Sequence, residues 1–332
     1  MSIYQRGTGI SIRALLERYG IRPVKTLGQN FLTDPNIVRK IIESAELNRD
    51  DTVCEIGPGF GALTAELAAR SSRVVAVEKD ARLALALADV LGRKGIIPCD
   101  TEPGSPSVIA NSVERGDARD RDSTTVGNID IVCADFLDYD LGSLPRTCKL
   151  VGNLPYRVTT PILMKAISAE SLSPLMVFMI QREVAQRICA PPGGRDYGAV
   201  SVAIQYRCDV RYAFDVSREV FIPKPNVDSA VIVLKGVTHL HGRPRDEDLF
   251  SAVVRAGFSK RRKMLRNALA ALVPNADALE AAFVQAGVKG TARAETLSVE
   301  EFIALADAVH DLSASSDVVN HSYMIADDER KD

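Results

Sequence analysis

The sequence of 332 residues lacks any run of 18 apolar residues, which excludes a transmembrane helix of ordinary length. Its first twenty residues contain no uninterrupted apolar stretch, which argues against a secretory signal and favours a cytosolic protein. Histidine and cysteine are scarce, with four and six residues, and no Cys-x-x-Cys pair occurs. We therefore expect no metal site, and we expect the cysteines to be small core residues in a reducing compartment.

The chain has an ordinary globular composition, because 46% of its residues are hydrophobic and 25% are charged. Between residues 20 and 235, short apolar runs alternate with helical segments, which predicts a doubly wound α/β domain with a parallel sheet. The expected strands are 52–56, 73–77, 129–134, 148–152 and 175–180, and the expected helices are 11–19, 35–45, 62–70, 81–92, 160–168 and 182–189. Runs at 209–216 and 227–235 could add antiparallel pairs at one sheet edge.

From about residue 245 the pattern becomes purely helical, with expected helices at 246–257, 260–272, 276–287 and 298–311. This predicts a small C-terminal helical domain. Residues 95–128 are rich in Pro, Gly, Ser, Asp and Arg, and we expect a disordered insertion there.

Charge is unevenly distributed, although the net charge is −2. Residues 181–270 hold 16 basic and 9 acidic side chains, giving +7, whereas residues 271–332 hold 4 and 12, giving −8. The densest basic cluster is Arg255, Lys260, Arg261, Arg262, Lys263 and Arg266. It is either a solvated helix face or a surface that binds the phosphates of a nucleic acid.

A glycine-rich turn, EIGPGFG at 55–61, closes one predicted strand and opens a helix. Glu78 ends the next strand, where a carboxylate can accept hydrogen bonds from both hydroxyls of a ribose. The turn is a tight connection in any α/β protein, or it binds a dinucleotide or S-adenosylmethionine. Its third glycine comes one residue too early for GxGxxG, and Pro58 lacks a donor for a pyrophosphate, so a ligand without phosphates is favoured.

A second motif, GNLPY at 152–156, also follows a predicted strand. The Asn153 side-chain oxygen and the Leu154 carbonyl could accept both N–H groups of an exocyclic amine, which favours a localised lone pair on its nitrogen. Pro155 stiffens the turn, and Tyr156 offers a face on which a base can stack. The alternative is an ordinary turn with a buried tyrosine.

No His or Lys lies near this motif, which suits methyl transfer from a sulfonium, because the methylated nitrogen loses its proton easily. A third motif, FIPKPNVDS at 221–229, places Phe221 in a rigid loop. There Phe221 could close the far face of a flipped base or be a core residue.

Taken together, these motifs resemble the small-subunit ribosomal RNA adenine N6,N6-dimethyltransferases over roughly residues 20–310. Further matching segments are LGQNFL (27–32), VEKD (77–80), QREVAQRI (181–188), YGAVSVAIQY (197–206) and FSKRRKMLRNAL (258–269). The resemblance implies a Rossmann-like methyltransferase domain over 21–240. It also implies an rRNA-docking domain over 245–312, with an N-terminal extension at 1–20 and a disordered acidic tail at 313–332.

The resemblance also implies roles for individual residues. S-adenosylmethionine is bound by Gln29, Asn30, Leu32, Gly57, Gly59, Glu78, Lys79, Asp135, Phe136 and Asn153. The catalytic residues are Asn153, Leu154, Pro155, Tyr156 and Phe221, with Phe221 packing on the target adenine, and the basic cluster binds RNA. Asp100 is a rival to Asp135 for the cofactor adenine, and we favour Asp135 because it lies only 18 residues before Asn153.

The implied substrate is a pair of adjacent adenosines in the 3′-terminal hairpin of small-subunit rRNA, methylated in the immature subunit by a monomer. Two alternatives remain: a methyltransferase of large-subunit rRNA, and a non-catalytic rRNA-binding assembly factor. A small-molecule methyltransferase is disfavoured by the basic segment at 181–270.

Overall fold

The computed structural model describes residues 11–23, 28–92, 127–168, 172–237, 241–260 and 263–313. The chain divides into two compact units: the first runs to Ala185 and resumes over Arg211–Gly236, and the second comprises Gln186–Val210 and the chain from Val237 onward. The expected domain boundaries at 240 and 245 stay a prediction, and they did not anticipate the segment Gln186–Val210 of the second unit. Most of the expected insertion at 95–128 and nearly all of the expected tail lie outside the described residues.

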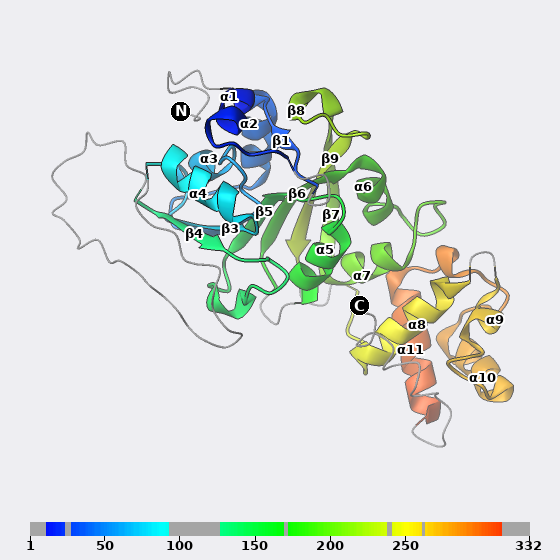
Figure 1. Ribbon diagram of the computed structural model, residues 1–332. Coiled ribbons are helices and arrows are strands. Elements are labelled where there is room, and N and C mark those ends of the chain that lie inside the picture. The colour runs from blue at the N-terminus through cyan, green and yellow to red at the C-terminus, as the bar shows by residue number, and fades with distance from the viewer. Residues whose placement is uncertain are drawn as a thin grey trace. The chain divides into compact units, whose positions relative to one another are not determined.

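The first unit is built on a seven-stranded sheet with the strand order β4-β3-β2-β5-β6-β9-β7 (Figure 1). Strands β2 to β6 pair in parallel, and β9 pairs antiparallel with β6. This confirms the α/β class and the antiparallel addition at one edge. The strands are β2 (Thr52–Ile56), β3 (Arg73–Glu78), β4 (Ile129–Cys133), β5 (Lys149–Asn153), β6 (Leu175–Gln181), β7 (Cys208–Val216) and β9 (Ser229–Gly236).

Helices flank this sheet (Figure 1). The parallel connections run in opposite directions from β2 and β5, so right-handed crossovers place α3 and α4 on the face opposite α5. Ligands bind doubly wound sheets where the direction reverses, at the carboxyl ends of the strands, which here is the edge beside β2 and β5. The helices of this part are α1 (Ile12–Arg18), α2 (Pro35–Ser44), α3 (Thr64–Ala68), α4 (Ala81–Val90) and α5 (Thr159–Ser168). Helix α6 (Arg182–Ile188) begins in the first unit, and its last residues, from Gln186, are assigned to the second.

The expected helix starts are explained by side-chain caps. Asp34 accepts a hydrogen bond from the Asn36 backbone nitrogen at 2.7 Å, with Pro35 at the first helical position of α2. Ser11 caps α1 in the same way through Ala14, at 3.2 Å. Each cap satisfies a backbone N–H that the helix itself cannot pair.

A second, two-stranded sheet joins distant segments of the chain. Strand β1 (Phe31–Leu32) pairs antiparallel with β8 (Phe221–Ile222), so that Leu32 lies opposite Phe221. Strands of two residues carry no periodic pattern, and for that reason the sequence did not predict this sheet. It brings the motif at 27–32 beside the motif at 221–229.

The second unit is helical, as expected. Its helices are α7 (Ala199–Arg207), α8 (Glu247–Ser259), α9 (Leu265–Leu269), α10 (Ala276–Ala286) and α11 (Val299–Ser313). Phe250, Phe283 and Phe302 are buried in its core. Within the described ranges, no helix has the length and hydropathy needed to span a membrane.

The helix expected at 260–272 was wrong in its extent, because among the described residues of that span only Leu265–Leu269 is α-helical. The Leu265 and Arg266 nitrogens donate to the carbonyls of Ala292 and Gly290, at 2.8 and 3.0 Å. Because these two nitrogens bond to the segment at 290–292, the helix begins at Leu265 and not at the expected residue 260. The sequence analysis also missed α7, whose residues Ser201, Val202, Ile204 and Tyr206 are all buried and therefore show no amphipathic pattern.

Candidate active site

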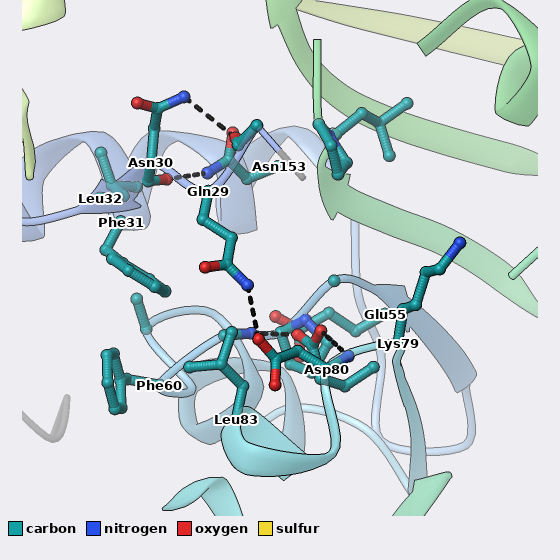
Figure 2. Close-up of a pocket in the computed structure, with 18 of the residues that line it drawn as sticks. Gln29, Asn30, Phe31, Leu32, Glu55, Phe60, Lys79, Asp80, Leu83 and Asn153 are labelled. Carbon is teal, nitrogen blue, oxygen red and sulfur yellow. Dashed lines mark hydrogen bonds between the residues drawn. The ribbon is translucent and has the colours of Figure 1, made fainter. Parts of the chain in front are cut away.

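A cavity opens in the first unit at the carboxyl ends of β2, β3 and β5, as Figure 2 shows. It collects most of the residues that the sequence motifs single out. Those that line it are Gln29, Asn30, Leu32, Gly57, Gly59, Glu78, Lys79, Asp135, Asn153, Leu154, Pro155 and Tyr156. Phe136 and Phe221 do not line it.

The glycine-rich turn holds the Glu78 carboxylate in place. Its Oε2 accepts a hydrogen bond from the Gly59 nitrogen at 3.1 Å, and its Oε1 accepts one from the Asp80 nitrogen at 2.9 Å. Gly59 has a positive φ of 58°, and a Cβ there would meet the Phe31 ring at 3.2 Å. A residue other than glycine at position 59 would therefore strain the backbone of the turn and press against the Phe31 ring. Burial raises the pKa of Glu78 to about 7.

Glu55 is a second buried carboxyl that lines the cavity, and the sequence analysis gave it no role. Only 1% of its surface is exposed, and among the described residues its Oε2 has no hydrogen-bond partner. Burial, followed by the nearby Glu78 charge, raises the pKa of Glu55 to about 8. Its position as the first residue of the EIGPGFG motif at 55–61 was the sequence feature that could have identified it.

Asp80 connects the cavity to the motif at 27–32. Gln29 Nε2 donates to Asp80 Oδ2 at 2.9 Å (Figure 2). Arg82 Nη2 lies 2.7 Å from the same oxygen. Asp80 also caps α4 by accepting from the Arg82 nitrogen at 3.0 Å. The Arg82 hydrogen bond is the largest influence on this carboxyl and holds the pKa of Asp80 at about 2.

Asp135 lines the cavity beyond the end of β4 and forms an ion pair with Lys79. Burial raises the pKa of Asp135, but the Lys79 hydrogen bond and that of the Leu137 nitrogen outweigh this and leave it lowered. The carboxylate is therefore ionised and ready to accept a hydrogen bond. Asp100, its rival, lies outside the described residues.

The GNLPY turn lies on the side of the cavity away from Asp80 and Lys79, as Figure 2 shows for Asn153. Asn153 Nδ2 donates to the Asn30 carbonyl at 2.9 Å (Figure 2). The Leu154 nitrogen donates to the Met179 carbonyl at 3.0 Å. Within the part of the chain that the structure describes, no hydrogen bond reaches Asn153 Oδ1 or the Leu154 carbonyl. Two acceptors are thus available at the cavity wall.

Tyr156 is fixed at its hydroxyl end. Its Oη lies 2.7 Å from Ser229 Oγ, at the start of β9, and Ser229 is completely buried. Gly28 packs against the same turn, because a Cβ on Gly28 would lie 3.4 Å from the Tyr156 nitrogen. These contacts fix the orientation of the ring beside the two acceptors.

An apolar wall that was not predicted from the sequence completes the cavity. It is formed by Ile12, Phe31, Phe60 and Leu83, and the Phe31 and Phe60 ring centroids are 4.9 Å apart. Helix α1 contributes Ile12 and is held to α4 by the Tyr19 hydroxyl, which donates to Asp89 at 2.5 Å. Part of the segment expected to be only an N-terminal extension therefore builds the site.

Three expected site features are not brought to the cavity. Phe136 is buried below Lys165, whose Nζ lies 5.8 Å from its ring centroid. Phe221 is buried in the core of the first unit, so its contact with a target base stays a prediction. The basic cluster belongs to the second unit, where Arg255, Lys260, Lys263 and Arg266 are exposed and Arg261 and Arg262 lie outside the described residues.

The donor set of the cavity fits S-adenosylmethionine. Its apolar wall suits an adenine ring, and the buried Glu78 can accept from ribose hydroxyls. Pro58 in the glycine-rich turn removes a donor that a pyrophosphate would use. Neither His nor Cys lines the cavity, and the described residues contain no group of three metal-ligating side chains.

Comparison with solved structures supports the same fold. A dimethyladenosine transferase from Plasmodium falciparum is similar with a TM-score of 0.61 and 21% identity, over 83% of this chain and 95% of that chain. The 23S rRNA methyltransferase ErmE is similar with a TM-score of 0.59 and 27% identity, over 84% of this chain and 99% of that chain. The Rossmann-like methyltransferase fold is confirmed.

Sequence comparisons are more specific. The chain is 43% identical to ribosomal RNA small subunit methyltransferase A of Pelotomaculum thermopropionicum, over 90% of this chain and 96% of the relative. It is also 43% identical to the protein of that name from Moorella thermoacetica, over 88% and 94%. The family profile described as ribosomal RNA adenine dimethylase matches residues 22–96 and 119–311, and the unmatched residues 97–118 fall within the expected insertion. The resemblance inferred from the motifs is confirmed, and the chain belongs to the ribosomal RNA adenine dimethylase family.

Proposed function

We propose that this protein transfers methyl groups from S-adenosylmethionine to the N6 amines of two adjacent adenosines in the 3′-terminal hairpin of small-subunit rRNA. The product is N6,N6-dimethyladenosine, made during ribosome biogenesis in the cytoplasm. The observation that carries the proposal is a pair of acceptors, Asn153 Oδ1 and the Leu154 carbonyl, that have no hydrogen-bond partner among the described residues and lie beside a cavity suited to the methyl donor.

On the donor side, Glu78 would accept from the ribose hydroxyls and Asp135 from the amine of the donor adenine. The rings of Phe31 and Phe60 would supply apolar contact. Asn30 and Gln29 reach the cavity on the segment that β1 fixes, and Gln29 is held by Asp80. The bound donor supplies a methyl group that is already activated on a sulfonium sulfur.

On the acceptor side, the target amine has a poorly nucleophilic nitrogen, because its lone pair is delocalised into the adenine ring. Hydrogen bonds from its two N–H groups to Asn153 Oδ1 and the Leu154 carbonyl would hold it pyramidal and aim the lone pair at the methyl carbon. A bond forms from nitrogen to carbon while the carbon–sulfur bond breaks, and the nitrogen then releases a proton to water. Orientation alone can supply about 7–11 kcal/mol of such a barrier.

Tyr156 would stack on the target base, since its ring is fixed by Ser229. Base–aromatic stacking contributes about 1–3 kcal/mol. The second unit would bind rRNA through the basic cluster, in which Arg266 is paired with Glu280 at 3.0 Å and Lys260 and Lys263 are exposed. We propose a monomer as the active form.

The large-subunit alternative has one observation in its favour, the likeness to ErmE at 27% identity. The curated relatives at 43% identity are named for the small subunit, and this favours the first proposal. The non-catalytic alternative is disfavoured because Glu78, Asn153 and Tyr156 are all present and line one cavity.

The test offers purified immature small and large subunits, from cells lacking this activity, to the protein with methyl-labelled donor. We expect label in the small subunit only, as dimethyladenosine near the 3′ end of its rRNA by mass spectrometry. Label confined to the large subunit would establish the alternative, and binding without label would establish an assembly factor.

A further inference from the structure

An exposed arginine stands directly beside the catalytic turn. Arg157 follows Tyr156 in the chain, lines the cavity and is exposed to solvent. Among the described residues, it is the only arginine that lines this cavity, and it forms no ion pair with any described carboxylate. Lys79, the other basic residue of the lining, is already paired with Asp135.

Two other arginines, Arg182 and Arg218, differ from Arg157 because each has a partner in the structure. Ser229, the partner of Tyr156, lies opposite Gln181 in the β6–β9 register, so Arg182 is next to it. Arg182 pairs with Asp228 at 3.3 Å, and Arg218 Nη1 donates to the Asn226 carbonyl at 2.9 Å. Of these three arginines, Arg157 is the one that lines the cavity, and its guanidinium has no ion pair among the described residues.

The covalent structure of a nucleotide indicates which of its groups would lie near the Arg157 guanidinium. A base whose amine points at Asn153 and Leu154 carries its ribose and phosphates at its other end, toward the mouth of the cavity. A guanidinium matches two phosphate oxygens at once, and such charge-assisted pairs are stronger than neutral hydrogen bonds. Helix α5 begins at Thr159, so its positive N-terminal end lies close to the same rim.

We propose that Arg157 binds a backbone phosphate of the target strand next to the adenosine being methylated. This inference rests on the proposed function and adds a phosphate contact in the first unit, separate from the basic cluster of the second. It makes Arg157 a binding residue for the RNA, with no part in binding the donor.

The test compares Arg157→Ala and Arg157→Lys with Arg146→Ala in the full chain. Arg146 is a matched control, because it is exposed, has no ion pair among the described residues, and precedes β5, whereas Arg157 follows that strand. Steady-state methylation of immature small subunits gives kcat and both KM values. Filter binding of the same subunits over a salt series, without donor, gives affinity independently of turnover.

For Arg157→Ala we expect roughly tenfold weaker binding and a similar rise in KM for the subunit, with kcat and the KM for the donor unchanged. The slope of log affinity against log salt should fall by about 0.7, which corresponds to one phosphate contact on a single strand. Arg157→Lys should lose less, and Arg146→Ala should behave like the unaltered protein.

Two results would overturn the proposal. One is unchanged subunit affinity and salt slope in Arg157→Ala, and the other is a raised KM for the donor with normal subunit binding, which would assign Arg157 to the donor carboxylate. Methylation by the unaltered protein tests the proposed function separately, since the binding ratios between variants do not depend on it.

Discussion

Asn153 donates its side-chain amide nitrogen to the backbone carbonyl of Asn30 at 2.9 Å. The bond joins the catalytic turn after β5 to the segment that precedes β1. Because the amide nitrogen is occupied, the amide oxygen is the end left for a ligand, and a flip would set two oxygens against each other. The segment before β1 therefore orients the side chain that, in the proposed function, receives the target amine.

Replacing Asn153 tests this arrangement. Asn153→Ala removes one of the two acceptors for the amine, and we expect kcat to fall by roughly 100-fold, as for loss of one preorganised polar group in other active sites. Binding to immature subunits should change little. Labelled-donor turnover and filter binding measure the two effects, with the exposed Asn36→Ala as control. Unchanged turnover would refute the role of Asn153.

Two substitutions of Tyr156 distinguish the contribution of its ring from that of its hydroxyl group. Tyr156→Phe keeps the ring and loses only the bond to Ser229, so a several-fold loss of kcat/KM is expected. Tyr156→Ala loses the stacking surface, worth about 1–3 kcal/mol, and should cost on the order of 10- to 100-fold. Equal losses in both variants would show that the hydroxyl, and not the ring, matters.

Glu78 should make donor binding depend on pH. Its pKa is raised by burial to about 7, so it is largely protonated at pH 6 and largely ionised at pH 8. Ribose hydroxyls donate best to the ionised form, and donor affinity should therefore rise with pH through about 7. Isothermal titration with S-adenosylmethionine from pH 6 to 8 measures this.

Glu78→Gln should bind the donor more weakly and lose most of this pH dependence. Glu66→Gln is the control, because Glu66 is also a buried carboxyl but does not line the cavity. An unchanged pH profile in Glu78→Gln would mean that another group titrates.

Asp80 is predicted to stabilise the first unit. Asp80→Ala removes the cap of α4, worth about 1 kcal/mol, and the hydrogen bond from Gln29, worth about 1 kcal/mol more. Asp80→Asn keeps a capping oxygen and should lose less. Urea unfolding, followed by circular dichroism, gives the difference in midpoint.

The Asp80 contribution also has a defined pH window. Its pKa is lowered from 3.8 to about 2, so the stabilisation is complete above about pH 4 and is lost as the pH falls toward 2. The gap between the unaltered protein and Asp80→Ala should narrow over that range. A difference in urea midpoint that stays constant with pH would show that Asp80 stabilises the unit through packing and not through its charge.

The basic cluster should act through charge. Changing Lys260, Arg261 and Arg262 together to Ala should weaken subunit binding and flatten its salt dependence. The matched control changes Arg49, Arg146 and Lys289, which are exposed, form no ion pair among the described residues and remove the same charge. Equal effects in both triple variants would show that only net charge matters.

Much of the site could be predicted because its motifs sit where strands end. The periodic pattern placed β2, β3 and β5, and parallel strands bring their carboxyl ends to one edge, so Glu78 and Asn153 had to lie near each other. Helix ends were equally predictable where a side chain caps them, as at Asp34 and Asp80.

The remaining features depend on long-range contacts that leave no local pattern. Ile12 lines the cavity because α1 packs against Phe31, Phe60 and Leu83 and is joined to Asp89, 70 residues after Tyr19. Phe136 directly follows Asp135 and Phe221 is the first residue of the motif at 221–229, yet both side chains are buried in the core. The late start of α9 is decided by the carbonyls of Ala292 and Gly290, which no sequence window around 260 contains.

The strand order also determines where the chain tolerates insertions. The stretch between Val90 of α4 and Ile129 of β4 enters the sheet at the amino end of a strand, whereas the cavity lies at the carboxyl ends. Extra residues at this junction lengthen a connection without changing the register of any strand that carries a reacting group. Related chains can therefore vary widely in length here while the distance between donor and acceptor stays the same.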